Sequence, residues 1–312
     1  MSPSAGSGIG ATRGFAGAAK SLVRWLDSWA PDPRDAERDP GEVDWLRVVP
    51  FLALHASCLL VFWVGASTAD LVLLAATFYA RMFGITGGYH RYFAHKTYKT
   101  SRAFQFALAA LACSATQKGP LWWAGNHRIH HKNADRPDDL HSPAHGLYHA
   151  HVGWVFEGRW DATPLDRIGD FARYPELAWL NRNHHVPAIA LVGLCALLGG
   201  FSGVVWGYLV STMLLWHATY TINSLAHTWG TRRYDTADTS RNNPWLALLT
   251  LGEGWHNNHH HFCAAARQGF RWWEIDITYY VLRALQAVGL VWEIREPPAH
   301  VTAPHAETRK AA

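Results

Sequence analysis

The 312-residue chain is 49% hydrophobic yet has a mean hydropathy of only −0.10, which indicates a membrane-embedded part and a polar part in one polypeptide. Its formal net charge of +4 is small and its Lys and Arg residues form no stripe, which argues against nucleic-acid binding. The four cysteines are isolated and no C-x-x-C occurs, so zinc ribbons, iron–sulfur clusters and a disulfide framework are not indicated.

The first 45 residues are expected to form a cytosolic tail that is partly disordered. Gly, Ala and Ser dominate residues 1–20, and no run there is apolar enough for the core of a signal peptide. Apolar residues then recur at helical spacing, which favours a short helix that lies on the bilayer or packs on the protein: Leu22, Leu26 and Trp29.

Two stretches of the chain carry almost no charge. Residues 48–80 contain a single charged residue, Asp70, and residues 186–231 contain no Asp, Glu, Lys or Arg. Because about 20 apolar residues span a bilayer, each stretch is long enough for a helical hairpin. Small residues near 65–68 and 199–203 mark where the hairpins turn. The expected spans are residues 48–66, 69–88, 186–200 and 203–223.

The distribution of cations predicts the topology. Both turns lack Lys and Arg, whereas residues 90–186 hold twelve of them, so the positive-inside rule places this segment and both termini in the cytoplasm. We therefore expect an all-α integral membrane fold: two hairpins carry a cytosolic helical cap that holds a dimetal site. The membrane domain is residues 46–295, with the cap in 89–185 and 224–295, and 296–312 form a disordered tail. A multi-pass protein of a bacterial-type inner membrane is expected.

Three histidine boxes fall on the cytoplasmic side of the predicted membrane domain. His90 and His95 form H-x-x-x-x-H, and H-x-x-H-H occurs twice, at residues 127–131 and 256–260. On a helix, residues i, i+3 and i+4 share one face, so each H-x-x-H-H can aim three imidazoles at one point. The first pair lies about 140° apart around an α-helix, so it converges only where the helix frays or ends.

The number of histidines predicts two metal ions. The boxes supply eight imidazoles, more than one ion takes, and His227 at the end of the fourth span is a ninth candidate. All-imidazole ligation suits Zn, Cu, Fe or Ni, and the H-E-x-x-H of zinc proteases is absent. A site that faces acyl chains has unactivated C–H bonds to oxidise, which favours a redox metal with O₂ over zinc.

Five motifs make the chain similar to membrane fatty-acyl desaturases of the stearoyl-CoA and cyanobacterial acyl-lipid Δ9 type, over residues 45–295. The motifs are GITGGYHR (84–91), HRIHHK (127–132), HVGW (151–154), NSLAH (223–227) and GEGWHN (252–257). The resemblance implies a mushroom-shaped fold with four transmembrane helices and a cytosolic cap that holds two irons. The implied iron ligands are nine histidines: His90, His95, His127, His130, His131, His227, His256, His259 and His260. It also implies that Asn223 holds a metal-bound water and that Gln117, Trp123 and Thr219 bend the acyl chain.

The implied reaction consumes O₂, two electrons and two protons, and leaves a cis double bond, with Δ9 as the expected position, and water. The implied cofactor is a pair of Fe²⁺ ions. No fused cytochrome b5, flavin or iron–sulfur motif is present, so an external donor of the ferredoxin or cytochrome b5 type is expected. Ala144 and His145 stand where the animal acyl-CoA enzymes have a basic pair that contacts CoA. The carrier therefore stays open between CoA, a glycerolipid and acyl carrier protein.

Two other functions remain open from the residues. A related diiron lipid hydroxylase would use the same boxes, and product mass separates the two reactions. A non-catalytic metal-binding membrane protein or transporter is the second alternative, although its ligands would lie within the spans, whereas these boxes flank them. Small residues on the helix that leads into His90 are the predicted wall of the acyl tunnel: Ala75, Ala76 and Ala80.

Overall fold

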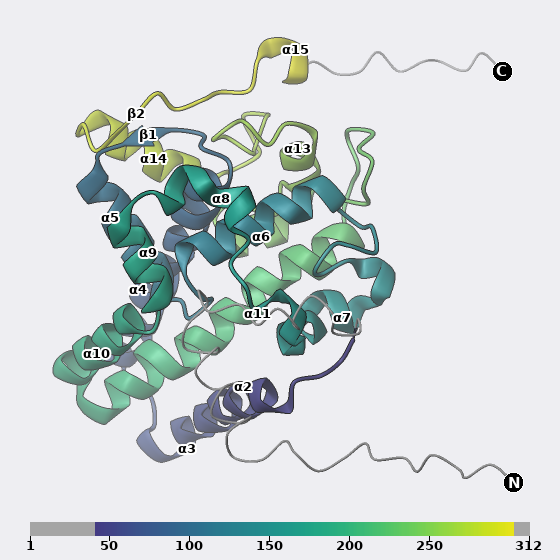
Figure 1. Cartoon of the computed structure of the whole chain (residues 1–312). Coiled ribbons are helices and arrows are strands. Elements are labelled where there is room, and N and C mark those ends of the chain that lie inside the picture. The colour runs from purple at the N-terminus through teal and green to yellow at the C-terminus, as the bar shows by residue number, and fades with distance from the viewer. Residues whose placement is uncertain (1–40, 303–312) are drawn as a thin grey trace, which may run out of the picture.

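Helices make up nearly all of the regular structure in residues 41–302, the part of the chain that the computed structural model describes. The predictions of a tail and a short amphipathic helix within residues 1–40 lie outside the described residues. The same holds for the predicted disorder of residues 303–312. In Figure 1, α2 (Trp45–Ser57), α3 (Val61–Val64) and α10 (Val186–Val204) lie at the bottom of the view, and the cap lies above them.

Three helical segments of the described chain are long and apolar enough to cross a membrane: residues 47–64, 68–94 and 186–227. The first contains α2, η2 (Cys58–Leu60) and α3. The second contains α4 (Thr68–Phe83) and η3 (Gly84–Ala94). The single charged residue of the stretch 48–80, Asp70, has a local role, because Ser67 and Asp70 form a reciprocal capping box at the start of α4.

The third segment turns back on itself. It runs through α10, η7 (Val205–Val210) and α11 (Ser211–Ser224), and inside it Gly200 adopts φ 60° and ψ −146°, which a residue with a side chain rarely adopts. Beyond the turn, a Cβ on Gly203 would lie 2.4 Å from the carbonyl oxygen of Cys195, so the two arms meet closely. The glycine-rich break in the sequence is thus a turn between two antiparallel arms (Figure 1).

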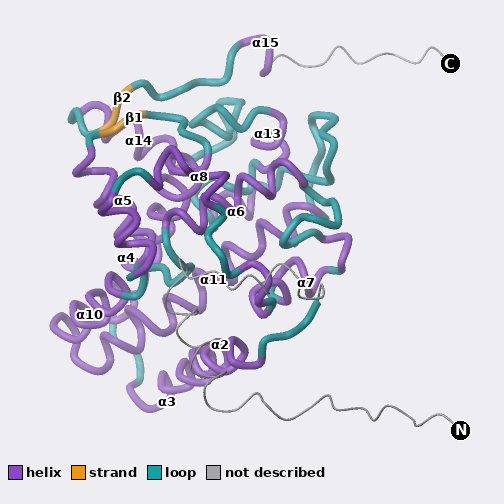
Figure 2. The backbone as a smooth tube through the Cα atoms, in the orientation of Figure 1, coloured by secondary structure: helices purple, strands orange, loops and turns teal. Residues whose placement is uncertain are grey.

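The cap is assembled from short helices that precede and follow this third segment in the sequence. Its largest buried side chains include Phe93, Leu121 and Leu177. A two-stranded antiparallel pair, orange in Figure 2, joins β1 (Lys99–Thr100) to β2 (Val291–Trp292). The remaining helices of the described chain are α5 (Arg102–Cys113), α6 (Pro120–Asn133), η4 (Pro143–His145), α7 (Leu147–His151), η5 (Gly153–Phe156), η6 (Gly158–Trp160), α8 (Leu165–Ala172), α9 (Pro175–Arg182), η8 (Leu225–His227), α12 (Pro244–Leu249), α13 (His256–His261), α14 (Ile277–Ala287) and α15 (Ala299–Thr302).

Two boundaries differ from the sequence-based expectation. The second membrane-length segment continues to residue 94, six residues beyond the predicted end, because η3 prolongs α4 through the first histidine box. The predicted disordered tail 296–312 begins with structure: α15 forms at Ala299–Thr302. Burial explains this helix, since Val301 packs with Tyr234 and Phe270 in a small apolar cluster.

Candidate metal centre

A π-helix brings the two histidines of the first box together. Residues Gly84–Ala94 have π-helical geometry, and the His95 amide donates to the His90 carbonyl oxygen at 3.1 Å. Because this geometry bonds residue i+5 to residue i, the two side chains lie on the same face. Their ring centroids are 4.8 Å apart. The expectation that the pair needs a frayed or ending helix is therefore incomplete: the helix widens through the box and then ends at His95.

Small residues allow the widened helix to lie deep in the protein. A Cβ on Gly84 would approach the Ala112 backbone nitrogen of α5 to 2.9 Å, and one on Gly88 would lie 3.3 Å from the Leu108 carbonyl oxygen. The GITGG run before His90 therefore permits close packing of η3 on α5. This packing holds the first box in the interior of the cap.

Each H-x-x-H-H box divides between two groups of imidazoles, which corrects the prediction that all three histidines of a box aim at one point. The i and i+4 members stay together and the i+3 member joins the other group. Around an α-helix, i and i+4 differ by about 40°, whereas i+3 and i+4 differ by about 100°. The five-histidine cluster is His90, His95, His127, His131 and His259, and the four-histidine cluster is His130, His227, His256 and His260.

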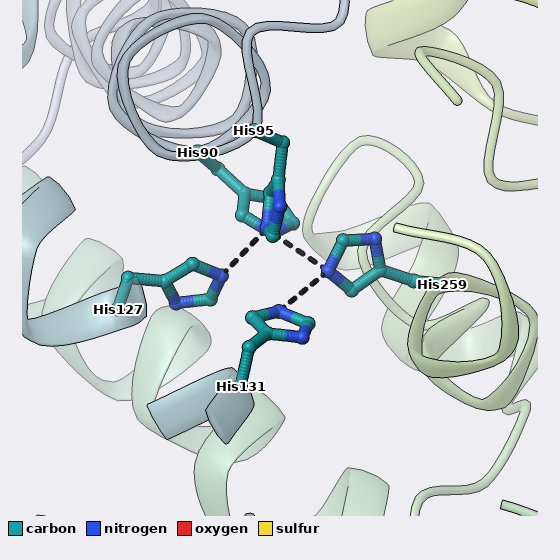
Figure 3. A group of neighbouring side chains, drawn as sticks. All are labelled: His90, His95, His127, His131 and His259. Atoms are coloured by element: carbon teal, nitrogen blue, oxygen red, sulfur yellow. Dashed lines mark hydrogen bonds between the residues drawn. The ribbon is translucent and has the colours of Figure 1, made fainter. Parts of the chain in front are cut away.

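Within each cluster the candidate ligand atoms lie within 4.8 Å of one another. Figure 3 shows the five-histidine cluster, in which His259 Nε2 lies 3.0 Å from His90 Nε2 and 2.9 Å from His131 Nε2. His95 Nε2 and His127 Nε2 are 3.0 Å apart. All nine histidines predicted as ligands are members of one cluster or the other.

The four-histidine cluster is backed by three aspartates. His130 Nδ1 lies 2.9 Å from Asp139. In the same way, His227 Nδ1 lies 3.0 Å from an oxygen of Asp135, and His260 Nδ1 lies 2.8 Å from Asp238. A carboxylate accepts a hydrogen bond from the N–H that it faces, so Nδ1 of each ring carries the hydrogen and Nε2 carries the lone pair.

The ring nitrogens of both clusters are arranged better for binding metal ions than for hydrogen bonding to one another. A neutral imidazole has one N–H, so His259 Nε2 cannot satisfy two neighbouring Nε2 atoms by hydrogen bonding. In the four-histidine cluster, His260 Nε2 is buried and has no hydrogen-bond partner among the described residues. Converging, buried nitrogen lone pairs of this kind are what a borderline transition-metal ion binds.

Burial keeps most of these imidazoles in the neutral form that binds metal. It lowers the pKa of His95, His127 and His131 well below the usual value, and the neighbouring histidines lower it further. The pKa of His259 is lowered for the same reasons. His130 differs: burial opposes its protonation, but Asp139, together with Asp135 and Asp238, outweighs burial and raises its pKa. Since ligands must be deprotonated, the five-histidine cluster is prepared to accept a metal ion at neutral pH.

An apolar cavity of about 90 Å³ opens beside both clusters. His127 and His256 contribute to its wall. Three residues predicted to bend the acyl chain line it together: the Gln117 side-chain amide donates to Thr219 Oγ1 at 2.8 Å, and Trp123 Nε1 donates to Gln117 Oε1 at 3.3 Å. The structure thus places them beside the histidines, while their role stays a prediction.

Asn223, predicted to hold a metal-bound water, also lines this cavity and sits one turn before His227. Its neighbour His256 lines the same cavity, so an amide and a cluster member border one space. The role of Asn223 as the partner of a metal-bound water stays a prediction.

The predicted tunnel wall is wrong. Ala75, Ala76 and Ala80 are exposed on the outside of α4. The residues of this helical segment that line the cavity are Met82, Ile85 and Thr86. The physical reason is helix phase, because Met82 lies two residues beyond Ala80 and so points to the opposite side.

Sequence reasoning missed the acidic and amide groups around the clusters. Glu253 lies 2.5 Å from His90 Nδ1 and also pairs with the buried Arg91. The Gln268 amide lies 3.4 Å from Nδ1 of both His90 and His259. The sequence hints at two of the three aspartates behind the four-histidine cluster, because Asp135 and Asp139 closely follow the second histidine box. No motif near Asp238 indicates its role.

Comparisons with a family model and with known proteins indicate the same family. The family model of fatty acid desaturases matches residues 62–295. The sn-2 palmitoyl-lipid 9-desaturase of Nostoc sp. (strain 36) is 36% identical over 82% of this chain and 92% of its own length. The icosanoyl-CoA 5-desaturase of Limnanthes douglasii is 34% identical, over 88% of this chain and 75% of that protein. The hex-5-enoyl-[acyl-carrier protein] acetylenase of Moorena producens (strain JHB) is 34% identical, over 81% and 85%.

Proposed function

Given that this chain belongs to the fatty acid desaturase family and is an oxidoreductase, we propose that it introduces a cis double bond, at Δ9, into a saturated acyl chain. The observation that carries the proposal is the position of the cavity. Its wall is largely apolar, and it borders both histidine clusters at once. An acyl chain that lies in this cavity has methylene groups next to both histidine clusters.

Two ferrous ions are the proposed cofactor, one in each cluster, and when bound they supply the redox chemistry with O₂ that removes hydrogen from adjacent methylenes. The proposed ligands are the nine histidines, each through Nε2. In three of them Nδ1 faces an aspartate, and in the other six Nε2 lies 3.0 Å or less from Nε2 of another histidine. Asn223 is the proposed partner of a metal-bound water. In sum, the acyl chain, O₂, two electrons and two protons yield the alkene and two molecules of water.

The protein's own part is to place the acyl chain. Gln117 bridges α11 and α6 through its hydrogen bonds to Thr219 and Trp123. This bridge crosses the cavity wall beside the clusters and so constrains where the chain bends. A bend in a close-packed apolar channel decides which carbons meet the clusters, and position is a large part of catalysis for such a reaction.

The proposed topology has four transmembrane spans, with the hairpin of α10 and α11 counted as two, and both termini and the clusters in the cytoplasm. The turn at Gly200 supports the count. A bacterial-type inner membrane is the proposed location. The proposed electron donor is an external protein of the ferredoxin or cytochrome b5 type.

Expression of the full chain in a host that lacks unsaturated-lipid synthesis tests the proposal. We expect growth without added unsaturated fatty acid and a cis double bond at carbon 9, mapped by mass spectrometry. A product that gains oxygen instead of losing two hydrogens identifies a hydroxylase, and an unaltered acyl pool contradicts both reactions.

A pair of tryptophan variants tests the assigned wall. Ile85→Trp fills the cavity and is expected to shift the products toward shorter chains, because a close-packed channel cannot absorb the added volume. Ala76→Trp is the matched control on the outer face of α4 and is expected to leave the length profile unchanged. Equal profiles for both variants would contradict the wall but leave the clusters untouched.

A further inference from the structure

A second cavity adjoins the first. It has a volume of about 100 Å³ and is lined on one side by Arg47, Pro50 and Phe51 at the start of α2. Because the first membrane-length segment begins at residue 47, this wall lies at the membrane boundary. The two cavities share five lining residues: Gln117, Trp122, Trp123, Trp154 and Tyr220. The second cavity is therefore the candidate site for the carboxyl end of an acyl chain whose methylenes lie beside the clusters, and for the carrier attached to that end.

The two cations that line this second cavity are engaged by carboxylates. Arg47 pairs with Asp161 and lies 3.4 Å from Asp44. Lys118 pairs with the other oxygen of Asp161, and its ammonium also lies 4.8 Å from the centroid of a Trp122 ring. Asp161 and Arg47 are both buried, at 5% and 7% exposure. Removing either cation to bind a phosphate would leave a buried carboxylate without its partner, which is costly.

A third cation at the rim is engaged in the same way. Arg159 Nε lies 2.7 Å from Glu157, which lines the cavity, and its guanidinium stacks over Trp160 at 4.6 Å. Glu157 is 3% exposed. Three cations thus face three carboxylates among the described residues around this cavity, and the group has no excess charge to offer an anion.

Two hydrogen-bond donors in the same wall have no acceptor. The indole nitrogens of Trp154 and Trp160 are buried and have no hydrogen-bond partner among the described residues. Both side chains line the second cavity. An indole N–H can only donate, and buried donors without an acceptor are rare, so these two await an acceptor on a ligand.

We propose that the second cavity is the carrier site and that it takes the ester end of a membrane glycerolipid with no net charge, rather than acyl-CoA or acyl carrier protein. This inference rests on the proposed desaturase function. An ester carbonyl supplies the acceptor that Trp154 and Trp160 lack. A lipid enters from the bilayer beside α2 and needs no free cation, whereas the phosphates of CoA or of a phosphopantetheine arm do.

A competition between isotopes tests the carrier. The purified, iron-loaded full chain is reconstituted in vesicles of ¹³C-palmitoyl phosphatidylcholine, with deuterated palmitoyl-CoA and deuterated palmitoyl-acyl carrier protein added in separate samples. Ferredoxin and cytochrome b5 reducing systems are both supplied. We expect the double bond in the ¹³C pool, in at least tenfold excess over the deuterated pool. A deuterated product in equal or greater amount overturns the carrier assignment, while no unsaturated product in any sample overturns the desaturase function itself.

Three variants test the residues by binding as well as by product. Asp161→Asn releases Arg47 and Lys118 and is expected to tighten palmitoyl-CoA binding, measured with metal-free protein in detergent, by about tenfold over wild type. Should this variant not fold, Glu157→Gln releases Arg159 and serves the same test. Wild-type protein that already binds palmitoyl-CoA as tightly as the folded variant contradicts the proposal.

The third variant removes one donor and keeps the ring shape. Trp160→Phe is expected to lower kcat/KM for the lipid by about 2- to 10-fold, the range for one neutral hydrogen bond, through KM and with iron content unchanged. Trp63→Phe, at a position 86% exposed on α3, is the matched control and is expected to behave as wild type. Identical kinetics for the two variants would show that the Trp160 indole does not bind the lipid.

Discussion

The two histidine clusters differ in how the protein supports them. The four-histidine cluster has one imidazole fewer, but three of its rings are backed by an aspartate at 2.8–3.0 Å: Asp139, Asp135 and Asp238. The five-histidine cluster has more imidazoles, but within residues 41–302 a single carboxylate backs it, Glu253, which also pairs with Arg91. It is also the less buried of the two.

The difference shows two ways of building a metal site. Aspartates raise the basicity of the imidazoles and fix their orientation, so a small number of ligands suffices. Where such backing is sparse, additional imidazoles provide the binding energy and tolerate the loss of one of them. Metal binding by the four-histidine cluster is therefore expected to depend strongly on each of its histidines. Metal binding by the five-histidine cluster is expected to depend less on any one histidine.

The largest expected effect is the loss of a ligand from the four-histidine cluster. His227→Ala leaves three imidazoles and the unpaired carboxylate of Asp135 behind the vacant position. We expect turnover to fall by more than about 100-fold and iron content to fall from two ions to one per chain. His261→Ala, whose ring stacks on Tyr234 outside both clusters, is the control and is expected to keep both ions. Normal activity and full iron in His227→Ala would exclude His227 as a ligand.

A smaller effect is expected from the corresponding change in the other cluster. His131→Ala leaves four imidazoles there, as many as the intact four-histidine cluster has. We expect turnover to fall by about 10- to 100-fold while iron content stays near two ions per chain, measured by elemental analysis. If His131→Ala loses an ion as readily as His227→Ala, the proposed tolerance of the five-histidine cluster is wrong.

The aspartates are expected to contribute through affinity. Asp139→Asn removes the charge behind His130 and keeps the side-chain size. Iron affinity, measured by competition with a chelator, is expected to fall by about 10- to 100-fold, with turnover largely restored at saturating iron. Asp166→Asn, at an exposed position on α8, is the control. An unchanged affinity in Asp139→Asn would mean that backing by aspartate does not distinguish the clusters.

The smallest expected effect concerns the amide that touches the five-histidine cluster. Gln268→Leu removes the contacts to Nδ1 of His90 and His259. Because a neutral amide orients an imidazole less strongly than a carboxylate does, we expect a loss of iron affinity below about 10-fold. Gln286→Leu on α14 is the control. A loss as large as that of Asp139→Asn would show that both clusters depend equally on their backing.

The sequence by itself determined most of the clustered histidines and the location of the membrane-length helices. The box spacing identified eight of the nine histidines that the two clusters contain, because i, i+3 and i+4 are neighbours on any helix, and the position of His227 at the end of an apolar stretch added the ninth. The uncharged stretches likewise located the membrane-length helices, because a span needs a continuous apolar run. These are local properties, and local periodicity encodes them.

Tertiary structure alone decided how the histidines are shared. His130 and His259 each join the cluster that holds the other two histidines of the opposite box, because rings of α6 meet rings of α13 there. Sequence spacing carries no information on that docking. The same holds for Asp238, which reaches His260 from a loop, and for the cavity wall, where Ile85 rather than Ala76 faces inward. Helix phase relative to distant partners is set by packing of the whole core, so no single stretch of sequence contains it.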